Sequence, residues 1–210
     1  MSKGRIISCD ADVAEGAAWL ADHCPHMADA LQQTGPLPLR RRPDGFAQLL
    51  NAIISQQVSV ASAQAIWGKL EAADMTNIAN VSAASWDDLR NLGLSRQKIR
   101  YAQALANAEI DYAAVREMSD GDVVARLVTV PGIGAWTAEI YSMFSLGRAD
   151  VFAPGDLALQ EAVRSLYDLD KRPSEKDLRR RALDWSPWRS VAARLLFAYY
   201  RVIKQREGIT

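Results

Sequence analysis

Cysteine and long hydrophobic runs are both scarce in this sequence. Its 210 residues include two cysteines, Cys9 and Cys24, which are too few for a disulfide framework, an iron–sulfur cluster or a four-ligand zinc site. No segment approaches the roughly 20 consecutive apolar residues of a membrane span. The opening segment MSKGRIISCDADVAEGAAWL lacks an apolar signal core. We therefore expect a cytoplasmic protein.

An excess of charge of one sign is also absent. The chain carries 25 basic and 25 acidic residues, which gives a formal net charge of zero. Composition alone therefore does not indicate a polyanionic partner, and any role in binding nucleic acid must depend on local features of the surface.

Helical periodicity is present along most of the chain. Apolar residues make up 49% of the sequence, enough for a sizeable core, and they recur at helical spacing with little period-two alternation. The pattern predicts an all-α fold. We expect helices over residues 10–20, 25–32, two runs between 44 and 73 separated by the polar segment SQQVS (residues 55–59), and further helices beginning near 86, 96, 121, 135, 156 and 188.

The segment VPGIGAWTA places a Pro-Gly-Ile-Gly turn between two apolar helical runs. Backbone N–H groups at the N-terminus of a helix can bind a phosphate oxygen without any basic side chain. The pattern predicts a helix-hairpin-helix whose phosphate-binding residues are Gly132, Ile133, Gly134 and Ala135. We also expect backbone carbonyls of Val128, Val130 and Ile133 to hold a monovalent cation, Na+ or K+. The alternative is a tight turn that only joins two packed helices.

Four separated motifs resemble one known family. VPGIGAWTA resembles the hairpin of the helix-hairpin-helix (HhH-GPD) DNA glycosylase superfamily, and VFAPGDLALQ resembles the loop that ends in the catalytic aspartate of that superfamily. FAQLLNAIISQQVSVASAQAIWGKL and WSPWRSVAARLLFAYY resemble the branch that removes alkylated purines, the DNA-3-methyladenine glycosylase II group. The resemblance spans most of residues 44–204.

The resemblance implies a catalytic role for Asp156. Bifunctional members carry a lysine where this chain has Trp136, and that lysine attacks the sugar to form a Schiff base, so the implied enzyme is a monofunctional hydrolase of the N-glycosidic bond. Asp156 would stabilise the oxocarbenium-like sugar and orient the attacking water. An aspartate in this context is also a common helix N-cap, and both roles can hold together.

The resemblance also implies a base pocket and a wedge. Trp136 is the leading candidate for stacking on a cationic base, with Tyr141, Phe152 and Phe197 as further walls, although aromatics at helical spacing are usually core. Gln57, with Gln56 beside it, would fill the gap left by an everted nucleotide; the alternative is a solvated turn. We expect secondary phosphate contacts from the basic residues Arg40, Arg41, Arg42, Lys98 and Arg100; the alternative is a solvated face.

By analogy with the family, we expect two helical lobes with a cleft between them, one formed by residues 46–135 and the other by residues 1–45 plus 136–210. The expected function is removal of 3-methyladenine and 7-methylguanine from double-stranded DNA by a monomer, with no catalytic cofactor and no iron–sulfur cluster. Two alternatives stay open: a non-catalytic helix-hairpin-helix module that only binds DNA, and a glycosylase for deaminated bases.

Overall fold

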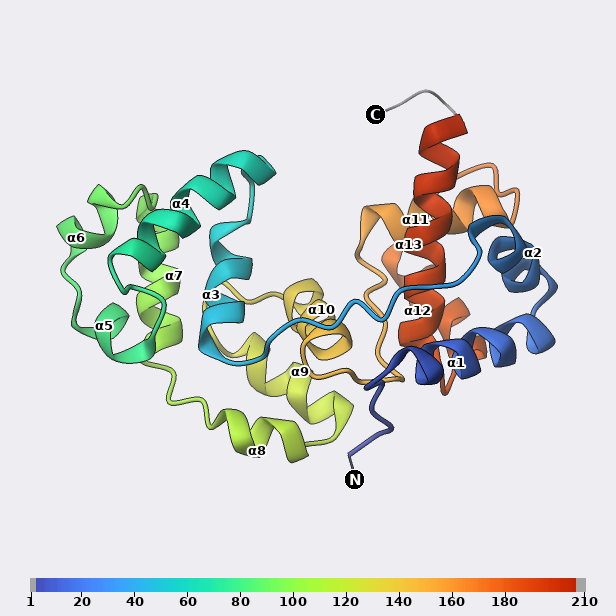
Figure 1. Cartoon of the computed structure of the whole chain (residues 1–210), viewed down its shortest axis with the longest axis horizontal. Helices are drawn as coiled ribbons and strands as arrows, with labels where there is room; N and C mark the ends of the chain where they lie inside the picture. The colour runs from blue at the N-terminus through green and yellow to red at the C-terminus, as the bar shows by residue number, and fades with distance from the viewer. Residues whose placement is uncertain (1–2, 207–210) are drawn as a thin grey trace. The chain divides into compact units, whose positions relative to one another are not determined.

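The computed structural model describes residues 3–206, and helices account for all the regular structure in this range. The helices are, in chain order, α1 (Asp10–His23), α2 (Pro25–Thr34), α3 (Phe46–Ile54), α4 (Val60–Ala72), α5 (Ile78–Ala83), α6 (Trp86–Asn91), α7 (Arg96–Ala106), α8 (Tyr112–Glu117), α9 (Asp120–Val128), α10 (Ala135–Phe144), α11 (Leu157–Leu166), α12 (Glu175–Arg181), the 3₁₀ helix η1 (Ala182–Trp185) and α13 (Arg189–Arg206) (Figure 1). The one β-type pairing in this range is an isolated antiparallel bridge between Ile6 and Arg148. The all-α class predicted from the sequence is confirmed.

The chain divides into two compact units. Among the described residues, the first unit contains Lys3 and residues 42–141, and the second contains residues 4–41 and 142–206. The unit boundaries at 42 and 141 lie a few residues outside the lobe boundaries of 46 and 135 expected from the sequence. α10 consequently begins in the first unit and ends in the second.

In the first unit, α3 packs against α7. The buried residues of α3 recur at helical spacing, which is the pattern of an amphipathic helix; they are Phe46, Leu49, Leu50, Ile53 and Ile54. Serine caps begin the neighbouring helices: the Ser59 side chain accepts a hydrogen bond from the Ser62 amide at the start of α4, and the Ser95 side chain accepts one from the Lys98 amide at the start of α7.

In the second unit, α13 packs against α1, α2 and α11. Gly16 allows α1 to lie close to the start of α13, because a Cβ atom at this position would lie 2.6 Å from the ring of Trp188, the residue before α13. Arg194 of α13 is buried and donates to the carbonyl oxygens of Leu39, Ser190 and Met143. Its guanidinium group therefore ties residues 39 and 143 to α13.

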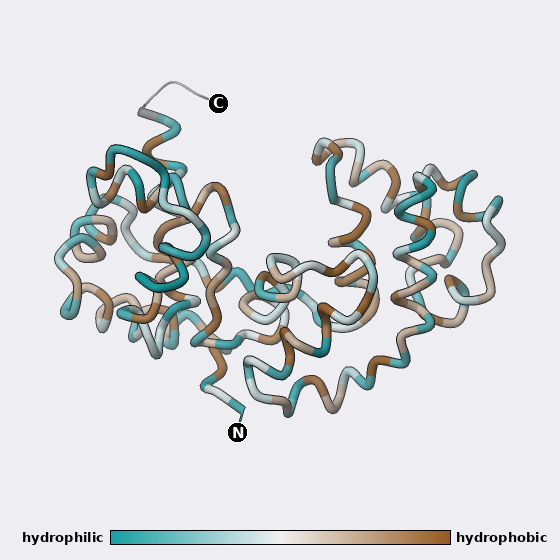
Figure 2. The backbone as a smooth tube through the Cα atoms, turned by 180° about the vertical axis from the view of Figure 1, so that it is seen from behind, coloured by the Kyte–Doolittle hydropathy of each residue, from teal (hydrophilic) through white to brown (hydrophobic). Residues whose placement is uncertain are grey.

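Short apolar stretches and polar stretches follow one another closely along the backbone of each unit (Figure 2). Within residues 3–206, none of the helices combines the length and the apolar character that crossing a membrane requires.

Candidate functional site

The hairpin between α9 and α10 forms as the sequence predicts. The Val130 amide donates to the Leu127 carbonyl (3.1 Å), the Ile133 amide to the Val130 carbonyl (3.0 Å), and the Ala138 amide to the Gly134 carbonyl (3.0 Å). Ile133 is buried and anchors the turn, whereas Gly134 and Ala135 are exposed. Because the Ile133 amide is already bonded within the turn, the exposed backbone at Gly134 and Ala135 is the part of the hairpin that a phosphate can approach.

Glycine at position 132 is required by both conformation and space. Its φ angle is +93°, in the region that side-chain-bearing residues rarely adopt. A Cβ atom at this position would lie 2.4 Å from Cγ of Tyr101 in α7. The hairpin therefore packs directly on the Tyr101 ring, a contact that sequence spacing gave no means of predicting.

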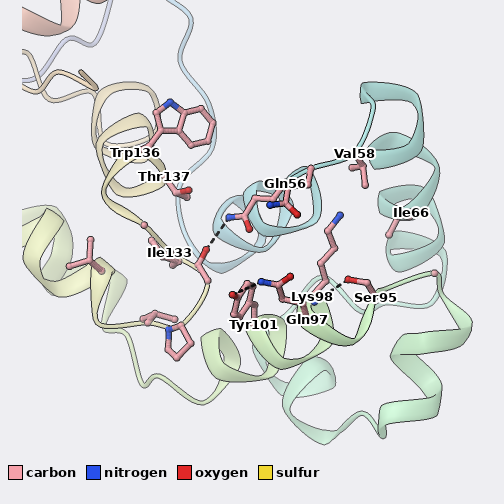
Figure 3. Close-up of a pocket in the computed structure, with 17 residues that line it drawn as sticks. Gln56, Val58, Ile66, Ser95, Gln97, Lys98, Tyr101, Ile133, Trp136 and Thr137 are labelled. Carbon is pink, nitrogen blue, oxygen red and sulfur yellow. Dashed lines mark hydrogen bonds between the residues drawn. The ribbon is translucent and has the colours of Figure 1, made fainter. Parts of the chain in front are cut away.

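The SQQVS turn (residues 55–59) is hydrogen-bonded to the hairpin. The side-chain amide of Gln56 donates to the Gly132 carbonyl at 2.9 Å, so this glutamine holds two segments together (Figure 3). Gln57 is exposed and has a positive φ of +56°. The turn thus presents Gln57 outward while Gln56 faces the hairpin.

Lys98 links the end of α3, directly before this turn, to α7. Its ammonium group donates to the Ile54 carbonyl at 2.6 Å, at the C-terminal end of α3, and the residue is 9% exposed. Burial lowers the pKa of Lys98. The sequence predicts Lys98 as a secondary phosphate contact, and the structure shows that the residue is buried.

A pocket of about 760 Å³ lies between the SQQVS turn, the start of α7 and the hairpin, all within the first unit (Figure 3). Trp136, the second residue of α10, lines this pocket and is 44% exposed. Val128, Val130 and Ile133, whose carbonyls were predicted to hold a cation, line it as well. The pocket brings together the predicted wedge, the hairpin and Trp136.

Tyr141, the last residue of the first unit, is buried. It is 4% exposed, and its hydroxyl oxygen accepts a hydrogen bond from the Gly45 amide at 2.7 Å. Burial raises the pKa of Tyr141 to about 12. Packing and this hydrogen bond account for the residue, and the base-pocket role remains a prediction.

In the second unit, Asp156 is the N-cap of α11. Its Oδ1 accepts hydrogen bonds from the amides of Ala158 (2.9 Å) and Leu159 (3.2 Å), and the residue is half-buried. The preceding loop is held by Gln160, whose side-chain amide donates to the Pro154 carbonyl at 2.8 Å. The carboxylate is therefore fixed in orientation by the helix it caps, as expected for an aspartate at a helix N-cap.

The remaining predicted aromatic and basic residues of the second unit have packing partners. Phe152 is buried, with its ring edge-on to Trp185 at 5.2 Å between centroids. Phe197 is half-buried, and the Arg40 guanidinium lies 6.0 Å from its ring centroid. Arg41 lies against Gly147, where a Cβ atom would overlap its guanidinium.

Comparison with known proteins identifies the family. The model of the HhH-GPD superfamily of base excision DNA repair proteins matches residues 50–187. YfjP of Bacillus subtilis is 29% identical over 121 residues, which is 56% of this chain and 42% of that protein. DNA-3-methyladenine glycosylase 2 of Escherichia coli is 29% identical over 172 residues, covering 75% of this chain and 57% of that protein. This chain thus spans about half the length of these two relatives.

A solved structure is similar over nearly its whole length. The 3-methyladenine DNA glycosylase Mag1 of Schizosaccharomyces pombe, in complex with abasic DNA, matches with a TM-score of 0.75 and 25% identity over 87% of this chain and 95% of that one. The fold, the four motifs and the family model agree. The chain therefore belongs to the HhH-GPD superfamily of base excision DNA repair proteins, and its resemblance to the DNA-3-methyladenine glycosylase group is confirmed.

Proposed function

We propose that the protein is a monofunctional DNA glycosylase that hydrolyses the N-glycosidic bond of alkylated purines, 3-methyladenine and 7-methylguanine, in double-stranded DNA. The observation that carries the proposal is Asp156. Its carboxylate is half-exposed at the N-terminus of α11 and is held in one orientation by two backbone amides.

A fixed carboxylate suits the chemistry of this reaction. An alkylated purine is activated as a leaving group, so the sugar develops positive charge as the bond to the base breaks. An oriented anion stabilises that charge without reorganising during the reaction. Asp156 supplies the anion and orients the water that attacks the sugar carbon. The released base takes the electrons of the broken bond, the hydroxyl group of the water bonds to the sugar carbon, and the remaining proton of the water passes to solvent.

The side chain at position 136 decides between hydrolysis and lyase chemistry. A lysine there would attack the sugar and form a Schiff base, whereas an indole cannot. Trp136 instead offers a 44% exposed aromatic surface, which suits stacking on a cationic base.

DNA binding uses the backbone of the hairpin. Exposed amides at the start of α10 bind a phosphate, which allows a chain with no net charge to hold a polyanion. The backbone carbonyls of Val128, Val130 and Ile133 would hold a monovalent cation, which would strengthen phosphate binding and would take no part in bond breaking. Gln57 fills the gap left by the everted nucleotide.

Asp156→Asn tests the proposal because asparagine caps a helix about as well as aspartate. The variant keeps its fold and its affinity for a duplex with an abasic-site analogue, and its rate of base release falls by about 100-fold or more. Asp111→Asn is a matched control: Asp111 caps α8 through the amides of Ala113 and Ala114 in the same way, and its substitution leaves release unchanged. Full activity in Asp156→Asn would overturn the assignment. Binding without release by the wild-type protein would favour the non-catalytic module.

A further inference from the structure

Lys98 lies in an unusual position for a lysine. It belongs to the first turn of α7, is 9% exposed, and lines the pocket beside the hairpin. Burying an ammonium group costs free energy unless its donors find partners. A buried lysine beside an open pocket therefore calls for an explanation in terms of what it binds.

Its donors are only partly used. An ammonium group has three N–H donors, and among the described residues the Lys98 side chain has one acceptor, the Ile54 carbonyl at 2.6 Å. The side chain extends from α7 toward the segment that contains Gln56 and Val58 (Figure 3). Two donors are left for a ligand in the pocket.

The electrostatics of the pocket favour an anion. None of the residues that line it is acidic, and Lys98 is the one charged residue among them. Two helices of ten or more residues also begin at the wall of the pocket, α7 after Ser95 and α10 after Gly134. The positive ends of both helix dipoles therefore add to the charge of Lys98.

We infer that Lys98 binds a phosphate group of the DNA backbone, distinct from the phosphate at the hairpin amides. The inference rests on the proposed function, because it takes DNA as the ligand. A second phosphate contact in the same pocket as Gln57 fixes the path of the strand on both sides of the wedge, so the hairpin and Lys98 together set where the duplex is opened.

The salt dependence of binding separates this role from helix capping. Each phosphate neutralised by a cationic side chain contributes about 0.9 to the slope of log K against log salt concentration. Lys98→Gln keeps a donor for the Ile54 carbonyl and loses the charge, whereas Lys98→Met loses both. For an abasic-analogue duplex, we expect both variants to reduce the magnitude of this negative slope by about one. Only Lys98→Met should lower the stability of the protein in urea.

Lys69→Gln is the matched control. Lys69 is exposed in α4 of the same unit and lies outside the pocket, so its substitution leaves the slope unchanged. A duplex series in which single phosphates are replaced by neutral methylphosphonates identifies the partner. One position should weaken binding by the wild-type protein and have no effect on Lys98→Gln.

Three outcomes distinguish the two proposals. An unchanged slope in Lys98→Gln, or no methylphosphonate position that depends on Lys98, overturns this inference and leaves Lys98 as a cap of α3 only, while the proposed function stands if base release persists. Failure of the wild-type protein to bind the duplex overturns both. A lower slope together with intact base release by the wild-type protein supports both.

Discussion

Gly132→Ala should destabilise the protein through one identifiable contact. The native φ of +93° costs about 1–2 kcal/mol for a residue with a Cβ atom. The new methyl group would lie 2.4 Å from Cγ of Tyr101, and relieving such an overlap by moving a packed ring or turn costs about 1–3 kcal/mol more. The expected loss is about 2–5 kcal/mol in the free energy of unfolding, measured as a lower urea midpoint with an unchanged m-value.

Two further variants test the contact between position 132 and the Tyr101 ring. Gly134→Ala places its methyl group where no atom beyond the adjacent residues lies within 4 Å, so its stability should stay within about 1 kcal/mol of wild type. Its DNA affinity should fall because the new group blocks the approach of a phosphate. Tyr101→Ala should lessen the cost of Gly132→Ala, because the methyl group then has space. A wild-type urea midpoint for Gly132→Ala, or strict additivity with Tyr101→Ala, would refute the contact.

Three other predictions follow from single interactions. Gln56→Ala removes the hydrogen bond to Gly132 and should weaken binding to an abasic-analogue duplex in a fluorescence titration. Affinity equal to wild type would show that DNA binding does not depend on this hydrogen bond. Burial raises the pKa of Tyr141 to about 12, so the contribution of this residue to stability is complete below pH 10 and is lost as the pH rises toward 12. Tyr141→Phe should be less stable than wild type at pH 7, because the Gly45 amide loses its acceptor. Between pH 10 and 12, urea unfolding should show a smaller loss of stability in this variant than in wild type. Arg194→Met leaves three backbone carbonyls without their donor and should cost about 3–5 kcal/mol; a cost below 1 kcal/mol would contradict the role of Arg194 in packing.

The fold class and the hairpin could be predicted because they depend on local signals. Helical periodicity, the serine caps and the PGIG turn all act within a few residues, and they set the start of α7 and of α10. Some short or polar helices escaped prediction: α5 and α8 have six residues each, too few to show a period, and α12 has Leu178 as its one buried residue. The equally short α6 could be predicted because Ser85 is a recognisable N-cap.

The contacts of the candidate site depend on tertiary structure, and the sequence could not supply them. Gln56 and Gly132 are 76 positions apart, and no spacing rule pairs them. Lys98 begins the buried face of α7, which continues with Ile99 and Ala102, so its helical register was a usable sign of burial. The double role considered for Asp156 could be stated from the sequence because capping is local; its catalytic part remains a prediction.

Release of free bases tests the central claim most directly. The purified protein is incubated with duplex DNA alkylated by a methylating agent, and the soluble products are identified by chromatography. The account predicts free 3-methyladenine and 7-methylguanine, an intact sugar–phosphate strand, and no covalent adduct on treatment with borohydride, since position 136 holds tryptophan in place of lysine. Methylated DNA that releases no base, or a borohydride-trapped protein–DNA adduct, would contradict it.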